Sequence, residues 1–148
     1  MQALRRFRQI FAAVRTHFHQ VEQLTGTGPA QLRALSILRE RPDTRVNELA
    51  TAMDIHQSTA SNLVKALLAR KLIRSSRSEA DARVLQLRLL PAGERVLQRL
   101  PGAYIGVLPR ALQTLPETML RRLNADLDIL LEAMDADDST AQSPLASL

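Results

Sequence analysis

The stretch VNELATAMDIHQSTASNLVKALLARKLI, residues 46–73, decides the fold that the sequence predicts. Residues 46–53 place apolar side chains on one helix face, the letters DIHQ at 54–57 indicate a tight turn, and a second helix is predicted from about Gln57 to Arg70. One stripe of this second helix is apolar and is expected to be buried. Its members are Ala60, Leu63, Val64, Leu67 and Leu68. Two short helices that meet at an angle in this way indicate a helix-turn-helix.

The opposite face of the second helix is polar. It offers hydroxyls, an amide and one long cation, from Ser58, Ser61, Asn62 and Lys65, with Gln57 and Thr59 beside them in the first turn. A face of this kind can enter a DNA groove about 12 Å wide and hydrogen-bond to base edges and phosphates. The same residues also fit an ordinary solvated helix face. The helix alone therefore leaves both interpretations open.

Two short alternating segments follow the helix pair. KLIRSS and RVLQLRLL, residues 71–76 and 83–90, alternate or nearly alternate apolar and polar residues, as the strands of a hairpin packed on one face do. The charged stretch SSRSEADARV, residues 75–84, is then the loop of that hairpin. A helix-turn-helix followed at once by such a hairpin is a winged helix.

The hairpin loop adds three candidate DNA contacts. Arg83 can reach the narrow minor groove beside the second helix, where negative potential is concentrated. Asp81 can pair with an arginine and hold the loop in shape, and Arg77 adds a further cation. An ordinary mobile hairpin loop explains the same charges without DNA.

The charge of the chain is unevenly distributed. Residues 1–100 contain 17 Lys and Arg against 8 Asp and Glu, a net charge of +9, whereas residues 101–148 contain 3 against 7, a net charge of −4. A basic block beside an acidic remainder favours a polyanion-binding face, because phosphate contacts supply most non-specific affinity for nucleic acid. An arginine-rich surface without a partner is the alternative.

Amphipathic helices are predicted on both sides of the winged helix. The N-terminal helix has an apolar stripe formed by Leu4, Phe7, Phe11, Val14, Phe18 and Val21. A second helix is predicted to begin at Pro29. Pro91 can begin another helix, Pro101 and Pro109 must kink or break any long helix there, and a last stripe runs from Met119 to Leu131. The two outer stripes favour a homodimer interface, since one small core cannot easily cover them. The expected organisation is an N-terminal dimerisation helix (1–28), a DNA-binding lobe (29–92), C-terminal dimerisation helices (93–134) and a disordered tail (135–148).

Composition removes several classes of mechanism. The chain contains no cysteine, which excludes disulfides, thiolate metal sites and thiol redox sensing. It shows no apolar run of the roughly 20 residues that span a bilayer and no signal peptide, so a cytoplasmic location without membrane contact is expected. His17 and His19 lie two residues apart on a predicted helix and cannot share a metal as an i, i+4 pair does. We find no catalytic constellation and expect no enzyme activity, cofactor or metal.

These elements together resemble the winged-helix core of the MarR family of bacterial transcriptional regulators. The resemblance covers about residues 4–134 and is carried by NELATAMDIHQSTASNLVKALLARKLI, then Asp81 and Arg83, then a hydrophobic strand and the letters PAG. It implies a mainly α (α+β) fold, a winged helix-turn-helix with flanking N- and C-terminal dimerisation helices. It also implies a homodimer with two recognition helices in successive major grooves of a pseudo-palindromic operator.

The resemblance sets the expected function. This is a sequence-specific, double-stranded DNA-binding transcriptional regulator, most simply a repressor, with a winged-helix module that binds protein instead of DNA as the alternative. The family often carries a small anionic aromatic effector between its two lobes. That phenolic effector is expected near His17, Phe18 and Tyr104, where histidine, arginine and the one tyrosine could meet it.

Four positions depart from the usual pattern of the family. Asp54 stands where the turn commonly has glycine, and a left-handed backbone there is tolerable for aspartate. His56 replaces a typical serine N-cap, so the cap is weak or comes from elsewhere. Ala82 replaces an arginine and Leu90 a capping threonine. We expect these changes to affect DNA affinity and sequence preference more than the fold.

Overall fold

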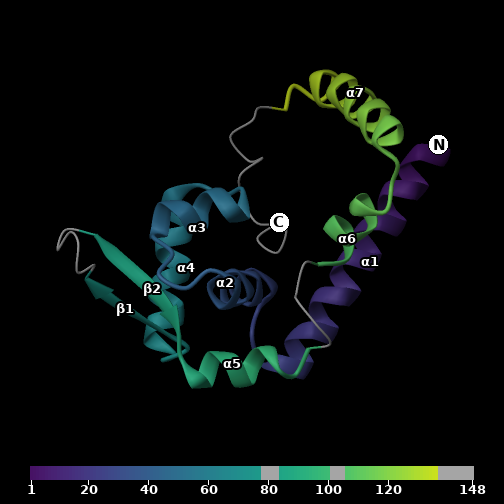
Figure 1. Ribbon diagram of the computed structural model, residues 1–148. Helices are drawn as coiled ribbons and strands as arrows, with labels where there is room; N and C mark the ends of the chain where they lie inside the picture. Colours follow the sequence, from purple (N-terminus) through teal and green to yellow (C-terminus); the bar gives the residue numbers. More distant parts are fainter. Residues whose placement is uncertain (78–83, 101–105, 137–148) are drawn as a thin grey trace.

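The computed structural model describes residues 1–77, 84–100 and 106–136. Its elements are α1 (Gln2–Thr25), α2 (Pro29–Glu40), α3 (Val46–Met53), α4 (Gln57–Ala69), β1 (Ile73–Arg77), β2 (Leu85–Leu89), α5 (Pro91–Leu97), α6 (Val107–Gln113) and α7 (Glu117–Ala133). Figure 1 shows α2 to α5 and the hairpin gathered in one lobe, residues 29–97, which we call the winged-helix lobe. Helix α6 packs beside α1, and α7 follows α6 in the part of the molecule away from the hairpin. The predicted mainly α (α+β) winged helix-turn-helix fold is confirmed.

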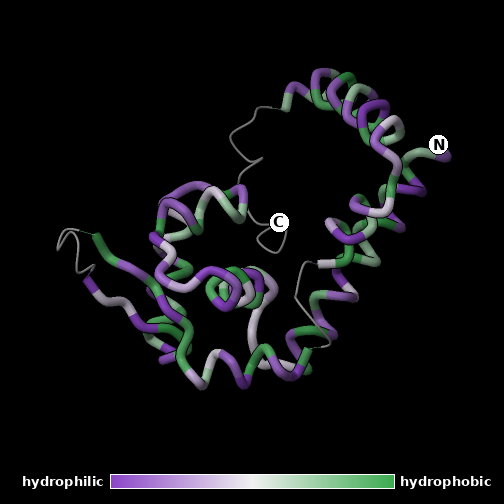
Figure 2. The backbone as a smooth tube through the Cα atoms, in the orientation of Figure 1, coloured by the Kyte–Doolittle hydropathy of each residue, from purple (hydrophilic) through white to green (hydrophobic). Residues whose placement is uncertain are grey.

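Helix α2 forms the centre of the winged-helix lobe. Pro29 is its first residue, as predicted, because a missing N–H costs no helix hydrogen bond at that position. Leu32, Leu35 and Leu38 are at most 1% exposed, and helices α3, α4 and α5 and strand β2 all pack against α2. Figure 2 shows hydrophobic residues of α2 in the middle of the lobe, with hydrophilic residues towards the outside of the other helices. The core of the chain is therefore the core of this lobe.

Both helices of the predicted helix-turn-helix are present, and their predicted faces are confirmed. Ala60, Val64 and Leu67 of α4 are buried, and Leu63 and Leu68 are partly buried against the core. The backbone of Asp54, between the helices, has a φ of 54°, which is the left-handed conformation that the sequence suggested. His56 is the N-cap of α4, and its side chain makes no capping hydrogen bond.

The predicted hairpin is also confirmed. Strands β1 and β2 are antiparallel, with Ile73 opposite Leu89 and Arg77 opposite Leu85. Ile73 and Leu87 are buried against the lobe, and the alternate positions point outward. Thr44 forms an additional bridge with Leu87, which joins the turn before α3 to the sheet. The prediction that the loop begins at residue 75 is wrong, because residues 75–77 pair with β2 as part of β1. Residues 78–83 lie outside the described residues.

The helical run that follows the hairpin ends at Leu97, before Pro101 and Pro109. Pro91 begins α5, as predicted, but α5 ends at Leu97 and the next described helix, α6, begins at Val107. Pro109 is the third residue of α6, in the first turn, where a backbone N–H has no acceptor within the helix. Pro101 lies outside the described residues. Among the described helices, none combines the length and the apolar character needed to cross a membrane.

The end of α4 adopts a Schellman turn around an unfavourable residue. The N–H of Leu72 donates to the carbonyl of Leu67, and the N–H of Lys71 donates to that of Leu68. Lys71 therefore occupies the left-handed position of the motif, with a φ of 54°. Glycine is preferred there because a Cβ atom crowds the following carbonyl oxygen. The backbone of Lys71, just after α4, is therefore strained.

We predict that Lys71→Gly stabilises the protein by roughly 0.5–1 kcal/mol, since the relief of left-handed strain exceeds the extra entropy that glycine has in the unfolded chain. The measurement is urea-induced unfolding at equilibrium. Lys71→Ala is the matched control, because it removes the same charge but keeps the Cβ atom. An alanine variant that gains as much stability as the glycine variant would show that the lysine charge, and not the backbone, is responsible.

Candidate nucleic-acid interface

Helix α4 presents the predicted polar face to solvent. Asn62 and Lys65 are exposed together with Ser58, and Ser61 is half-buried beside them. Their spacing places these four residues on one side of the helix, opposite the stripe buried against α2 and α3. Gln57, which is exposed, and Thr59, which is half-buried, flank this side in the first turn. We call the six residues the α4 polar face.

The first turn of α4 is suited to an anion. It contains no acidic residue, and its leading N–H groups have no acceptors within the helix. These N–H groups and the helix dipole favour negative charge at this end. The turn from Asp54 to His56 precedes this end, and Ile55, between them, is buried and fixes the turn to α3. The α4 polar face therefore combines neutral hydrogen-bonding groups, one ammonium and a favourable helix end.

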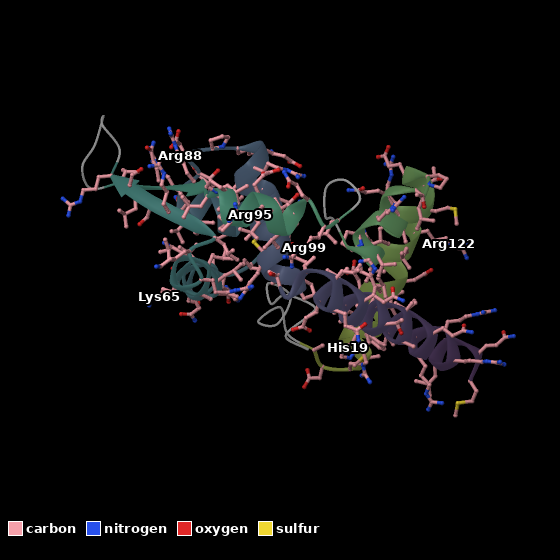
Figure 3. The ribbon with its side chains drawn as sticks, turned by 90° about the horizontal axis from the view of Figure 1, so that it is seen from below. His19, Lys65, Arg88, Arg95, Arg99 and Arg122 are labelled. Carbon is pink, nitrogen blue, oxygen red and sulfur yellow. The ribbon has the colours of Figure 1, made fainter. Side chains whose placement is uncertain are left out.

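The hairpin carries the second group of candidate contacts, of which only part is described. Arg77 is exposed at the end of β1 that leads into the loop, whereas Asp81 and Arg83 lie outside the described residues. Arg74 and Arg88 face each other across the two strands. In Figure 3, Lys65 of α4 and Arg88 of the hairpin both lie on the part of the molecule away from Arg122 of α7. The basic hairpin and the α4 polar face thus belong to the same lobe.

An ion pair at the base of the hairpin was not anticipated from the sequence. Arg88 Nε and Nη2 donate to the two carboxylate oxygens of Asp43, in the turn before α3. The hydrogen bond from Arg88 is the largest influence on Asp43 and lowers its pKa below the ordinary value, and the charge of Arg74 acts in the same direction. The pair also neutralises one of two facing arginines. The alternation of apolar and polar residues along RVLQLRLL predicts that Arg88 lies on the outer face of the hairpin. No local sequence pattern predicts that it pairs with Asp43.

Asp43 connects the hairpin to the helix pair through its backbone as well. Its N–H donates to the carbonyl of Leu87, at 3.1 Å, and its own φ is 65°. The next residue, Thr44, accepts from the N–H of Leu87 at 2.9 Å. The turn before α3 is therefore joined to β2 by two backbone hydrogen bonds and one bidentate ion pair. This arrangement fixes the base of the hairpin relative to α3 and α4.

The residues predicted to bind an effector are only partly described. His17 and Phe18 are half-buried neighbours on α1, and His19 is exposed. Tyr104 lies outside the described residues. Among the residues that the structure describes, no group of three or more His, Asp or Glu side chains is arranged to hold a metal ion.

Comparison with known proteins gives consistent matches. Residues 28–85 match the model of the MarR family. The chain is 30% identical over 91 residues to the HTH-type transcriptional regulator YsmB of Bacillus subtilis, and the match covers 62% of this chain and 62% of that protein. It is 22% identical over 129 residues to the HTH-type transcriptional repressor MdtR of Bacillus subtilis, covering 87% of this chain and 83% of the other.

A solved structure of similar fold spans almost the whole chain. The structure of BpsR from Bordetella bronchiseptica, described as concerning the regulation of its DNA binding by 6-hydroxynicotinic acid, is 26% identical, with a TM-score of 0.56. The match covers 92% of this chain and 93% of BpsR. The likeness therefore extends beyond the winged-helix lobe to the flanking helices.

We predict that the Asp43–Arg88 pair contributes to the acid dependence of stability. The pKa of Asp43 is lowered in the folded chain. The stability that its ionised carboxylate contributes is therefore complete above the unfolded pKa of about 3.9, and it is lost as the pH falls through the pKa of the folded state. Asp43→Asn keeps a side chain that tolerates the left-handed backbone but removes the charge. The urea midpoint of the parent should therefore fall more steeply below about pH 5 than that of the variant. Parallel curves for the two proteins would contradict a native pairing of this carboxylate.

Proposed function

We propose that this chain, which matches the model of the MarR family over residues 28–85, is a MarR-family, double-stranded DNA-binding transcriptional regulator of the cytoplasm that acts as a homodimer. The observation that carries the proposal is the α4 polar face, held outward by a buried stripe on the other side of the same helix. Such a helix can lie in the major groove, where Asn62 and Ser61 would hydrogen-bond to base edges. Lys65 would contact phosphate, which adds affinity without sequence preference.

The hairpin supplies the second contact of the proposed complex. With α4 in the major groove, Arg83 would reach the adjacent minor groove, Arg77 would neutralise phosphate and Asp81 would hold the loop in shape. The fixed base of the hairpin at Asp43 and Arg88 supports this role, because a wing can direct an arginine only if its base does not swing. A relative that is a repressor, MdtR, supports repression as the regulatory outcome.

A homodimer is supported by apolar side chains that the single chain leaves exposed. On α1, Leu4 is 48% and Phe11 61% exposed, and Phe7 and Val14 lie on the same stripe. On α7, no residue is buried, and the exposed apolar side chains are Met119, Ile129, Leu130 and Leu131. A second copy that covers the stripe of α1 and the stripe from Leu120 to Leu131 would remove this surface from water. It would also present two copies of α4 to one operator.

A small anionic aromatic effector is the proposed signal. His17 and Phe18 are half-buried on α1, between the exposed interface stripe of that helix and its buried end at Val21. The similar protein BpsR, whose DNA binding is described as regulated by 6-hydroxynicotinic acid, supports an effector of this class. Together with Tyr104, these side chains would bind the effector and shift the chain away from its DNA-binding conformation.

We predict that substitutions at base contacts and at backbone or groove contacts have different effects on DNA binding. Asn62→Ala should relax discrimination at particular base pairs, each worth about 1–3 kcal/mol, because it removes a donor and acceptor from a base edge. Lys65→Ala and Arg83→Ala should instead weaken binding to most sequences and reduce the salt slope by about one unit each. Arg95→Ala, an exposed cation on α5 outside the proposed contact, is the control for lost charge.

The parent protein first selects DNA fragments from the source genome. These fragments are then titrated with the parent and with each variant at several salt concentrations. Binding that does not depend on salt, or binding by the Asn62 and Lys65 variants that equals the parent on every duplex, would contradict the proposal. A chain that binds no duplex but retains its fold would favour a protein-binding winged helix instead.

We predict that the chain sediments as a dimer at micromolar concentration, and that Phe11→Asp raises the dimer dissociation constant by at least about 100-fold. The estimate follows from two phenylalanine side chains, each worth about 1.5–3 kcal/mol when fully buried. Gln20→Asp is the control, since Gln20 is exposed on the opposite side of α1. A monomeric parent, or equal effects of the two substitutions, would contradict this interface.

A further inference from the structure

The C-terminal end of α1 is held by arginines from two other parts of the chain. Arg70 Nη2 donates to the carbonyl of Gly26, at 3.1 Å, and to Thr27 Oγ1, at 3.0 Å. Arg99 Nη1 donates to the carbonyl of Thr25 at 3.4 Å. Figure 3 shows Arg99 near the end of α1 that meets the winged-helix lobe. The last turn of α1 contains no basic residue of its own, so these arginines supply its positive charge.

The physical basis of this contact is the unsatisfied end of a long helix. The last carbonyls of a helix have no intrahelical donors, and the helix dipole makes them partly negative. A guanidinium group offers several N–H donors in a rigid plane, and its charge strengthens each hydrogen bond. Arg70 also uses Nη1 to donate to Gln31 Oε1 of α2, at 2.5 Å. One side chain therefore binds three groups on the α1–α2 junction.

The α1–α2 junction, to which Arg70 donates, is buried and held by its own hydrogen bonds. Thr25 and Thr27 are 2% and 1% exposed. The hydroxyl of Thr25 donates to the carbonyl of Val21 at 2.8 Å and accepts from the N–H of Thr27 at 3.1 Å. Because the junction is buried and internally hydrogen-bonded, a group attached to it is attached to a fixed point on α1.

Arg70 is the C-cap of α4, the helix proposed to read DNA. The α4 polar face begins at the other end, at Gln57, so Arg70 holds the helix at the end furthest from the first base contacts. A helix of 13 residues is about 20 Å long at 1.5 Å per residue. A rotation of about 10° about its held end would move the far end by about 3.4 Å, which is the rise of one DNA base pair.

We propose that Arg70 is a positioning residue for DNA recognition: it sets the angle between α4 and α1, and thereby the half-site spacing that the dimer accepts. The proposal rests on the proposed function, because spacing has a meaning only for two copies of α4 on one operator. Arg70 makes no contact with DNA in this role. Its effect is transmitted by the hydrogen bonds to Gly26, Thr27 and Gln31.

The first experiment measures the angle without DNA. The chain has no cysteine, so spin labels can be attached at Gln20→Cys on α1 and Ser58→Cys near the start of α4, in full-length chain diluted with unlabelled chain. We expect a narrow distance distribution for the parent and a broader or shifted one for Arg70→Ala. Arg70→Lys, which keeps the charge but not the fork of donors, should be intermediate. Gln31→Ala, which removes one acceptor and leaves α4 intact, should give a milder change in the same direction. Arg95→Ala should equal the parent.

The second experiment measures the spacing preference. The probes are the duplex that the parent selects most strongly from a random library and the same duplex with one base pair inserted or deleted at its centre. The parent should lose affinity about tenfold or more on each altered duplex, whereas Arg70→Ala should lose about threefold or less. The salt slope of Arg70→Ala should equal that of the parent, because no phosphate contact is removed.

The outcomes separate this proposal from the one on which it rests. A parent that selects no duplex, or that tolerates every spacing, overturns the proposed dimeric DNA binding, and the spin-label distances still decide whether Arg70 sets the helix angle. Unchanged distances in Arg70→Ala and Gln31→Ala overturn the positioning role. A salt slope reduced by about one unit with an unchanged spacing preference also overturns it, because Arg70 would then be a phosphate contact.

Discussion

The structure depends on the burial of one helix. Leu32, Leu35 and Leu38 of α2 are almost completely removed from water, and helices α3, α4 and α5 and strand β2 use α2 as their common packing surface. Because α4 gives its apolar stripe to this core, its remaining side can only face solvent. The polar residues of α4 are therefore presented by the same packing that stabilises the lobe. A loss of the α2 core would remove the proposed recognition surface together with the fold.

Local patterns were sufficient to predict the elements of the winged-helix lobe. The 3.6-residue periodicity of apolar side chains located both helices of the helix-turn-helix, and the alternation of apolar and polar residues located the hairpin. Asp54, which stands where the family commonly has glycine, indicated the left-handed turn between α3 and α4. Lys71 was not recognised as a further left-handed position, because a lysine carries no signal for that backbone conformation. The prolines indicated a break after the hairpin, but periodicity could not decide where α5 would end.

The contacts that orient the elements could not be predicted from one sequence. Asp43 and Arg88 are 45 residues apart, and Arg70 and Gly26 are 44 residues apart, so neither pair leaves a local pattern. Arg88 pairs with a carboxylate in the turn before α3, and Arg70 donates to the carbonyl of Gly26 just after α1, where helix carbonyls need donors. Composition shows that the winged-helix half of the chain is rich in arginine, and only the fold shows which arginines serve structure. The basic surplus therefore overestimates the charge that is free to meet DNA, because Arg88 and Arg70 are already engaged by the protein.

The central claim is that two copies of α4 occupy the major groove of one duplex. The most direct measurement is methylation protection with dimethyl sulfate on a genomic fragment that the protein selects, because the reagent modifies guanine N7 in the major groove and adenine N3 in the minor groove. The account predicts two clusters of protected guanine N7 atoms separated by about one helical turn, 10–10.5 base pairs. A bound fragment on which every guanine N7 remains reactive would contradict it.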